Sequence, residues 1–399
     1  MSGEAVRVTS ASELLEALQG AAKVVEVVDE LRDLPTLRLA RGQTLRGTSR
    51  RARLHFARGA DGVALAGDNV LEHLAIAAAP RRRAVFLAST AAEPVSGCIA
   101  LRDLIVTGQI ECLLAEQDDL RHLELVRIDV AAADVVDRLE RPSGNGVACL
   151  QGAVAIWNRT TVSRELTLRV DAVRIGAPGV PVRGGGLFVA GFADGAGGQV
   201  RAESVQVQAV YCDSGLGASD RSTICGGVFI LPGVRVERVE CDGPQVSLGA
   251  NAVPIDNWGD VVNWLVNGPV TTHGPNAVAI VNAGRLGTLD VRGKVETFAD
   301  GARACAVYGP AEHIRLADVR TRGAGATGIH IVSRVGHLEV NGLLDVRGVA
   351  GIGMVKGRLE RLQADGVHIE AGGCVDRLAV PNVRLADPEG QPVRVDAAA

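Results

Sequence analysis

The sequence predicts an all-β fold: a single-stranded, right-handed parallel β-helix, or solenoid, with an N-terminal capping helix. Three observations predict it. Apolar residues recur about every 24 residues in the last third of the chain, glycines recur at a matching interval, and each repeat alternates apolar and polar residues as strands do. Connections between parallel strands are almost always right-handed. The apolar column is Val239, Leu265, Leu289, Leu316, Leu338 and Leu362, and the glycine column is Gly274, Gly323, Gly348 and Gly372.

A repeat of this length fits one coil of a β-helix. Three short strands with their turns use roughly 24 residues and return the chain about 4.8 Å along the solenoid axis, which is the spacing of neighbouring strands. The inward residues of each coil then pack on those of the next. Leucine-rich repeats have a similar period, but each repeat needs a helix or an Asn-terminated consensus, and this sequence has neither.

We expect one structural unit after a short cap. Ser10 and Glu13 form a predicted capping box, an apolar stripe follows, and Gly20 ends the helix. Residues 1–22 are therefore assigned to the cap and residues 23–399 to the β-helix. The N-terminal repeats are more widely spaced, which predicts loop insertions, and such insertions often share a binding face. They are expected near 79–97, 138–146, 176–199 and 211–226.

Composition and charge limit the compartment and the partners. No basic start precedes an apolar core, and no apolar run is long enough to span a bilayer, so a cytoplasmic protein without membrane contact is expected. The formal charge is −4 and the one basic run, Arg81 to Arg83, is short, so nucleic acid is not expected as a partner. The C-terminal end lacks an amphipathic cap, which predicts a homo-oligomer.

The eight cysteines lack Cys-x-x-Cys spacing, and most lie in apolar strand contexts. This pattern favours reduced thiols in the core over a metal site or a catalytic thiol. The sequence therefore predicts no metal and no cofactor.

One candidate binding surface follows from the alternation in Val270 to His273 and in the matching runs of the next coils. Charged and aromatic side chains would point outward and stack coil on coil, so that guanidinium groups could bind a carboxylate or a sugar and acid or base groups could transfer protons. The alternative is a solvated face with cross-strand ion pairs. The outward set is Thr271, His273, Glu296, Phe298, Arg320, Arg322, Asp345 and Arg347, and the inward set is a threonine ladder of Thr272, Thr297 and Thr321.

A second candidate is the segment Asp256 to Asp260, which with Trp264 holds two of the three tryptophans. Asn282 follows Asn257 by 25 residues, so their amides could stack as a ladder one coil apart, which is usually a structural device. The alternative is a binding corner in which Trp258 offers a stacking face and Asp256 a carboxylate.

The residues also carry a resemblance. Val8 to Ser10 and Gly42 to Gly47 resemble the start of pectate-lyase-like right-handed β-helices. The stretch from Asp256 to Tyr308 resembles an uncharacterised family of bacterial right-handed β-helix proteins. Its motifs read approximately Asp-Asn-Trp-Gly, Thr-Ser-His-Gly, Val-Asn-Phe-Gly, Glu-Thr-Phe-Gly and Gly-Ala-Arg-Gly-Phe-Asn-x-Tyr. The matching segments begin at Asp256, Thr271, Val281, Glu296 and Gly301, with departures at Ala283, Ala306 and Arg322. The resemblance implies the fold and its handedness, and it does not imply any particular activity.

Two enzyme types with this fold match incompletely. Polygalacturonase-like hydrolases place paired carboxylates ahead of His-Gly and Arg-x-Lys motifs; His273-Gly274 and Arg292-Gly293-Lys294 are present, but the carboxylate motifs are not at the right places. Pectate lyases need calcium-binding carboxylates, and no convincing triplet is present.

We therefore expect a cytoplasmic scaffold or binding protein that presents a sheet face and inserted loops to a small-molecule, carbohydrate or protein partner. The alternative is an enzyme with a cleft on the β-helix, either a carbohydrate-active lyase, hydrolase or epimerase or a cofactor-free isomerase or cyclase. Acid, base, cationic and aromatic groups within about three coils indicate the site. The candidates for catalysis are His273, Glu296, Asp256, Arg303 and Tyr308, and those for ligand binding are Asn257, Trp258, Asn282, Phe298, Arg320 and Arg322.

Overall fold

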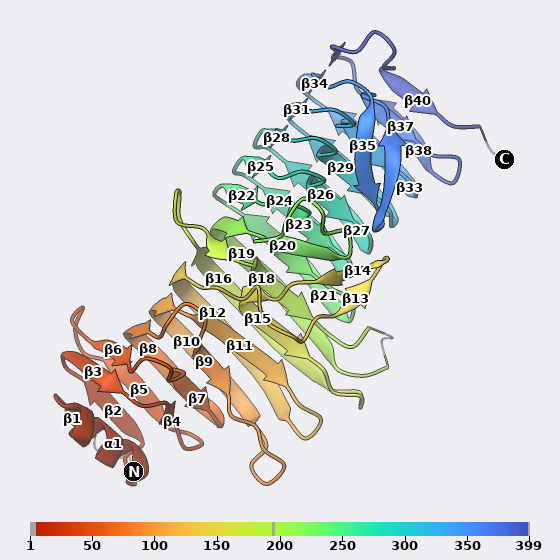
Figure 1. Ribbon diagram of the computed structural model, residues 1–399. Coiled ribbons are helices and arrows are strands. Elements are labelled where there is room, and N and C mark those ends of the chain that lie inside the picture. Colours follow the sequence, from red (N-terminus) through yellow and green to blue (C-terminus); the bar gives the residue numbers. More distant parts are fainter. Residues whose placement is uncertain (1–4, 194–195, 398–399) are drawn as a thin grey trace.

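The computed structural model describes residues 5–193 and 196–397. This part of the chain is an all-β parallel β-helix, in which each coil stacks on the previous one from the N-terminus to the C-terminus (Figure 1). One helix lies at the N-terminal end. The predicted fold class is confirmed.

A 15-stranded sheet forms one wall of the solenoid, here called the front wall. Thirteen of its strands form the main path, one from each coil, and neighbours on this path pair in parallel. The other two belong to a hairpin described below. These strands are β4 (Leu37–Arg38), β7 (Val63–Leu65), β9 (Arg83–Leu87), β11 (Gln109–Leu114), β15 (Gly152–Asn158), β18 (Gly185–Ala190), β20 (Thr223–Ile230), β23 (Ala252–Asn257), β26 (Val278–Asn282), β29 (Arg303–Val307), β32 (Ile329–Ile331), β37 (Val367–Ile369) and β40 (Val393–Val395).

A 23-stranded sheet forms the rest of the solenoid, here called the rear wall. Its main column is β1 (Val6–Val8), β2 (Val24–Val27), β5 (Thr44–Gly47), β8 (Gly67–Ala77), β10 (Ser96–Thr107), β12 (Asp119–Ala132), β16 (Glu165–Ile175), β19 (Gln199–Asp213), β21 (Val234–Cys241), β24 (Asp260–Val266), β27 (Arg285–Val291), β30 (Ala311–Leu316), β33 (Arg334–Val340) and β38 (Cys374–Ala379). The second column is β3 (Glu30–Leu34), β6 (Arg53–Phe56), β17 (Val182–Arg183), β22 (Gln245–Leu248), β25 (Val270–Thr272), β28 (Val295–Thr297), β31 (Val319–Thr321), β34 (Leu344–Val346) and β39 (Val383–Leu385).

The inward side chains form one continuous apolar core between the walls. The pairing of rear-wall strands shows that the predicted apolar column is wrong at three positions. Leu265 and Leu316 do not pair with the other members of the column, and Leu362 lies outside the coils. Central coils repeat every 25 residues, and the last step of the column is longer. The true column is Val239, Trp264, Leu289, Ile314, Leu338 and Leu378.

Two antiparallel hairpins project from the coils. One consists of β13 (Ser143–Gly144) and β14 (Val147–Cys149); β13 and the turn lie within the predicted insertion near 138–146, and β14 lies beyond it. The other consists of β35 (Gly351–Val355) and β36 (Arg358–Leu362), in a region predicted to be a regular coil. The other three predicted insertions lie only partly outside the coils, since each contains residues of front-wall strands.

The predicted cap helix is present as α1 (Ala11–Gln19). Ser10 is its N-cap, and its hydroxyl accepts a hydrogen bond from the Glu13 backbone N–H at 3.2 Å. Burial of Leu14, Ala17 and Leu18 fixes the helix on the first coils. Strand β1 precedes the helix and pairs with β2, so the rear wall already begins within the segment assigned to the cap.

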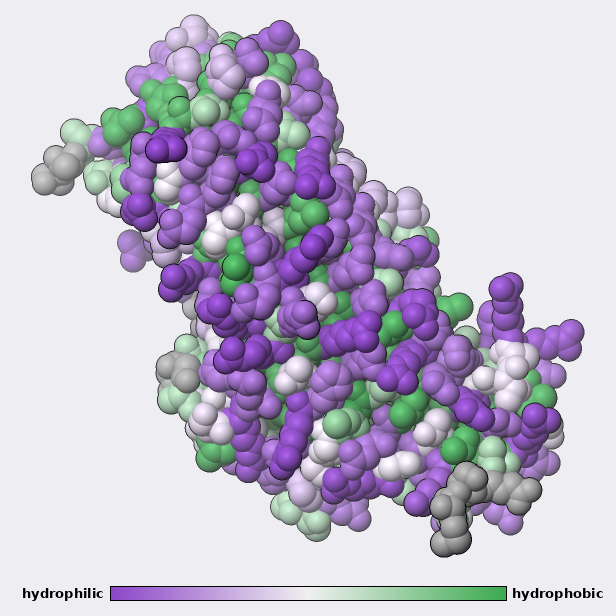
Figure 2. Space-filling view, turned by 180° about the vertical axis from the view of Figure 1, so that it is seen from behind, coloured by the Kyte–Doolittle hydropathy of each residue, from purple (hydrophilic) through white to green (hydrophobic). Residues whose placement is uncertain are grey.

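The surface opposite the view of Figure 1 is mostly hydrophilic, with hydrophobic residues scattered among charged ones (Figure 2). At the C-terminal end the side chains of Leu378, Val393 and Val395 are exposed. The homo-oligomer that would cover them stays a prediction. No helix in the described part of the chain has the length and apolar character needed to cross a membrane.

All eight cysteines are free, and six of them are buried. Burial raises the pKa of the Cys112, Cys241 and Cys305 thiols to about 12. Cys98 and Cys374 are exposed, so the predicted core location does not hold for these two.

Candidate functional site

The two hairpins meet over the outer face of the front wall. Each turns through two residues with positive φ: 49° and 81° at Asn145 and Gly146, and 47° and 75° at Lys356 and Gly357. Positive φ at both turn residues is the geometry of the type I′ turn, which Asn-Gly favours. The tips touch, because a Cβ at Gly357 would lie 2.8 Å from the Gly146 carbonyl oxygen. They form a roof over the sheet.

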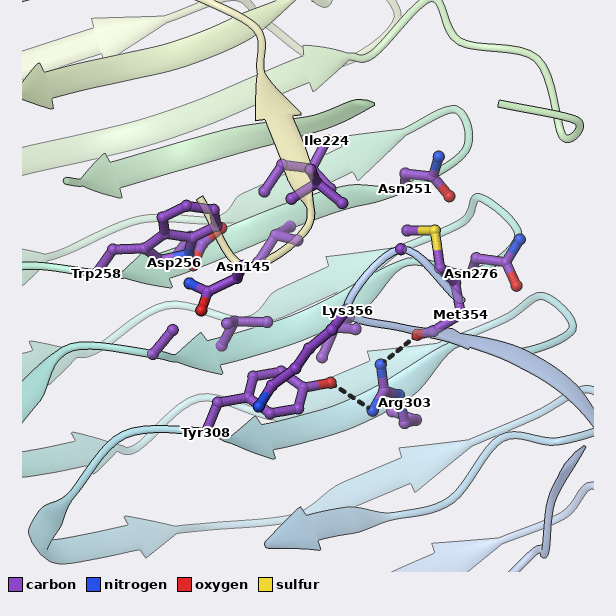
Figure 3. A pocket seen from close by; sticks show the side chains of 16 residues that line it. Asn145, Ile224, Asn251, Asp256, Trp258, Asn276, Arg303, Tyr308, Met354 and Lys356 are labelled. Atoms are coloured by element: carbon purple, nitrogen blue, oxygen red, sulfur yellow. Dashed lines mark hydrogen bonds between the residues drawn. The ribbon is translucent and has the colours of Figure 1, made fainter. Parts of the chain in front are cut away.

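A pocket of about 60 Å³ lies beneath this roof (Figure 3). Its floor is a small apolar cluster on the outer face of the front wall, separate from the main core. The cluster consists of Val253, Val278, Val281 and Ala306. Ile224 and Met354 add apolar surface to the lining. By the volume a water molecule needs, this pocket holds roughly four waters or one small ligand.

Arg303 supplies a buried cation to the pocket. It begins β29, lies in line with Val253 and Val278 of the preceding coils, and is only 2% exposed. Its guanidinium donates hydrogen bonds to the Tyr308 hydroxyl at 2.8 Å and to the Met354 carbonyl oxygen at 2.7 Å. Its Nε has no hydrogen-bond partner. None of the ion pairs among the described residues involves Arg303.

His330 lies between Arg303 and Glu370 and contacts both side chains. Arg303 Nη1 lies 2.7 Å from His330 Nδ1, and His330 Nε2 lies 2.6 Å from a Glu370 carboxylate oxygen. A guanidinium can only donate, so Nδ1 accepts and Nε2 carries the proton that is donated to Glu370. Burial, followed by the charge of Arg303, lowers the pKa of His330 to about 3, and the imidazole is neutral.

Asp256 faces the same pocket and is fully buried, yet neither of its carboxyl oxygens has a hydrogen-bond partner. Burial raises its pKa well above the ordinary value. The indole N–H of Trp258, close to this carboxyl but outside hydrogen-bond geometry, offsets part of that rise and is itself without a partner. Unpaired buried polar atoms are rare in folded proteins, so these three beside one cavity indicate a place for a ligand.

An open groove of about 570 Å³ adjoins the pocket. Asn145, Tyr308, Lys356 and Gly357 line both spaces. Lys356 is at the tip of the second hairpin, between the pocket and the groove, and its ammonium lies 5.0 Å from the centre of the Tyr308 ring. The groove therefore shares the wall at the hairpin tips with the pocket, and Lys356, Arg358, Glu360 and Glu370 are the charged residues that line it.

The structure gathers four of the predicted site residues at this pocket: Asp256, Trp258, Arg303 and Tyr308. Asn257 and Asn282 are buried beside it and form the predicted ladder, in which the Asn257 amide donates to Asn282 Oδ1 at 2.8 Å. The Asn282 amide in turn donates to the Gly309 carbonyl oxygen at 3.0 Å. These contacts occupy both amides in holding coils together.

The remaining predicted site residues are on or beside the rear-wall strands β25, β28 and β31 and do not line the pocket. His273 stacks on Phe298 with ring centroids 4.7 Å apart. Glu296 pairs with Lys294 at 2.7 Å and lies 3.7 Å from Arg320. Beneath them Thr272, Thr297 and Thr321 are fully buried, as the predicted inward ladder requires. The outward set is thus a network of ion pairs and stacked rings on the sheet, in which Asp345 is buried and pairs with Arg320 and Arg347, so its predicted exposure is wrong.

Sequence reasoning missed the roof and the groups behind Arg303. The Asn145-Gly146 pair, followed by Val147, is a turn signal for a hairpin, whereas Lys356-Gly357 offers only the glycine. His330 and Glu370 gave no comparable signal, because they are 40 residues apart and meet only through the stacking of β32 on β37.

Comparison of the chain with known protein families, with curated proteins and with solved structures gives no match. The resemblance of the segment Asp256 to Tyr308 to a bacterial β-helix family therefore stays a prediction.

Proposed function

We propose that this β-helix is a small-molecule binding protein whose pocket takes a compact monocarboxylate with an apolar body. The observation that carries the proposal is Arg303, a buried cation whose hydrogen-bond partners are a hydroxyl, a carbonyl and a neutral imidazole. Burying a cation without a directly paired anion costs several kcal/mol, about what an incoming carboxylate would recover.

The rest of the lining agrees with such a ligand. The apolar floor suits a short aliphatic body, while the free indole N–H of Trp258 and the carboxyl of Asp256 suit a second polar group. Lys356 at the mouth favours an anion on its way in. A neutral Asp256 removes the acidic charge from the lining of the pocket itself, although Glu360 and Glu370 line the adjoining groove.

Isothermal titration calorimetry on the full chain tests the proposal. Acetate and isobutyrate are titrated against their uncharged amides, acetamide and isobutyramide. We expect at least one carboxylate to bind and its amide to bind at least tenfold more weakly. Equal binding of acid and amide, or no binding of either acid at 10 mM, would refute the proposal.

Two arginine variants locate the binding. Arg303→Met should abolish carboxylate binding. Arg322→Met is the matched control, since Arg322 also has a buried Nε without a partner but lies at the end of β31 in the rear wall. Carboxylate binding that survives Arg303→Met, or that is lost equally in Arg322→Met, would contradict the assignment.

Asp256 favours a second candidate, an enzyme that uses the same pocket. A carboxyl kept protonated by burial, in a pocket that an arginine also lines, can act as a general acid on a bound carboxylate substrate. This candidate corresponds to the isomerase or cyclase alternative. Turnover of a bound carboxylic acid by the native chain, lost in Asp256→Asn while binding persists, would favour it over simple binding.

A further inference from the structure

A cluster of nitrogen and oxygen donors lies on the rear wall, away from the pocket. Strands β30 and β33 pair in parallel with His313 directly opposite His337, and the two imidazole rings stack with centroids 4.7 Å apart at 22°. Glu339 follows His337 by two positions, so its side chain leaves the same face of the same strand. One ligand atom from each residue lies within 4.8 Å of those of the other two.

The donor atoms are available for a ligand. His313 Nε2 is buried and has no hydrogen-bond partner. His337 Nε2 lies 3.7 Å from Glu339 Oε2, which is beyond hydrogen-bond distance. Arg315 pairs with the other oxygen, Glu339 Oε1, and this contact holds the carboxylate in place. Among the described residues, Oε2 has no ion pair closer than the 3.7 Å to His337 Nε2.

We propose that His313, His337 and Glu339 bind a zinc ion. Two imidazole nitrogens and one carboxylate oxygen are a donor set typical of Zn²⁺ sites that leave a fourth position open. Calcium and magnesium prefer six or more oxygen donors, which this cluster does not offer. With metal–donor bonds of about 2.0–2.1 Å, tetrahedral donors lie roughly 3.4 Å apart, so the side chains need to close by about 1 Å.

The neighbouring coils make the proposal specific. Thr288 lies opposite His313 in the preceding coil, and Arg377 lies opposite His337 in the following coil. A guanidinium beside a dication is repulsive, while the Arg315 contact orients the carboxylate ligand from outside the site. Removing Arg377 should therefore tighten zinc binding, and removing Arg315 should weaken it.

Equilibrium dialysis and calorimetry of the chelator-treated full chain with zinc chloride test the site. The exposed thiols of Cys98 and Cys374 could also bind zinc, so the measurements use the Cys98→Ser/Cys374→Ser background. We expect one zinc per chain with a dissociation constant in the micromolar range or tighter. His313→Ala, His337→Ala and Glu339→Gln should each weaken binding at least tenfold, and Arg377→Ala should leave it unchanged or stronger.

His273→Ala is the matched control, because His273 also stacks on a ring at 4.7 Å in the rear wall, but its neighbour is Phe298 and offers no second ligand. Zinc binding should be unchanged in this variant. Absence of binding at 1 mM zinc overturns the proposal, and so does binding that persists in the His313→Ala/His337→Ala variant. Circular dichroism of each variant checks that loss of zinc reflects loss of ligands in a folded chain.

Discussion

Arg303 donates a hydrogen bond to Nδ1 of His330 at 2.7 Å, and this contact fixes the tautomer of an imidazole that in turn donates to Glu370. The cation and the carboxylate are thus linked through a neutral ring and do not touch. The arrangement leaves Nε of the guanidinium without a hydrogen-bond partner, in a side chain that lines the pocket. The effect of this arrangement on the free energy of unfolding can be measured as a function of pH.

The first prediction concerns His330. Its folded pKa is about 3 and its ordinary value is 6.5, so the unfolded chain binds a proton that the folded chain does not between these values. Its contribution to stability is present above pH 6.5 and falls by up to about 1.4 kcal/mol for each pH unit below it. His330→Gln keeps an acceptor and a donor and should remove this loss. Urea unfolding between pH 4 and 7 measures it, with His122→Gln, outside the pocket, as the control. The same pH slope in His330→Gln as in the native chain would contradict the prediction.

Asp256 should have the opposite effect. Its pKa is raised in the folded state, so above the ordinary value of 3.8 the folded chain holds a proton that the unfolded chain loses. Native stability should therefore fall by up to about 1.4 kcal/mol per pH unit above 3.8 until the raised pKa is reached, relative to Asp256→Asn. Asp103→Asn is the control of opposite sign, because hydrogen bonds from Arg127 lower the pKa of Asp103. Its stabilising contribution is lost as pH falls. Parallel pH profiles for native and Asp256→Asn chains would show that the carboxyl is not held protonated.

The third prediction concerns the meeting of the hairpin tips. Gly357→Ala places a methyl group 2.8 Å from the Gly146 carbonyl oxygen and should open the roof, weakening carboxylate binding at least tenfold. Gly179→Ala is the matched control, since Gly179 has the same φ of 75° but nothing within 4 Å of the added Cβ. It isolates the cost of backbone strain, about 1 kcal/mol. Calorimetry and thermal unfolding of both variants separate strain from contact. Equal ligand binding in the two variants would mean that the roof does not control the pocket.

The asparagine ladder gives a prediction about stability alone. Asn282→Ala removes one of the two acceptors of the buried Asn257 amide, which keeps the Arg285 carbonyl oxygen, and takes the amide donor away from the Gly309 carbonyl oxygen. It should lower the free energy of unfolding by about 1–3 kcal/mol. Asn267→Ala, at an exposed turn, should change it by no more than about 0.5 kcal/mol. A double variant Asn257→Ala/Asn282→Ala should cost less than the sum of the single variants, because each removes the other's partner. Strict additivity in chemical unfolding would argue against a ladder.

Much of the fold was predictable, because inward residues of a solenoid repeat with the coil. The helix at Ser10 to Gly20 and the buried threonines were also predictable from capping and alternation. The register was not: Leu362 follows Leu338 by 24 residues and imitates another coil, whereas the structure aligns Leu338 with Leu378. The hairpin that contains Leu362 covers the pocket, so the same error hid the site.

Four pocket residues were predicted because they lie in the segment from Asp256 to Tyr308, where acid, base, cationic and aromatic groups occur within about three coils. The groups that complete the pocket come from distant segments and carry no local pattern. His273 and Glu296 were grouped with that segment because coil spacing alone does not say which wall a strand joins. Only the pairing of β25 with β28 places them in the rear wall.

Gly146 and Gly357 are about 200 residues apart in the chain, yet their backbones touch. Repeat proteins otherwise depend on nearest-neighbour contacts, so partly stacked intermediates are common to them. A slip of one coil anywhere between the two hairpins would displace the tips by about 4.8 Å and break their contact. The roof closes only when every intervening coil is stacked in register. A ligand that binds beneath the roof would bind only the fully stacked chain. By mass action it would stabilise that state over partly stacked intermediates and make unfolding more cooperative.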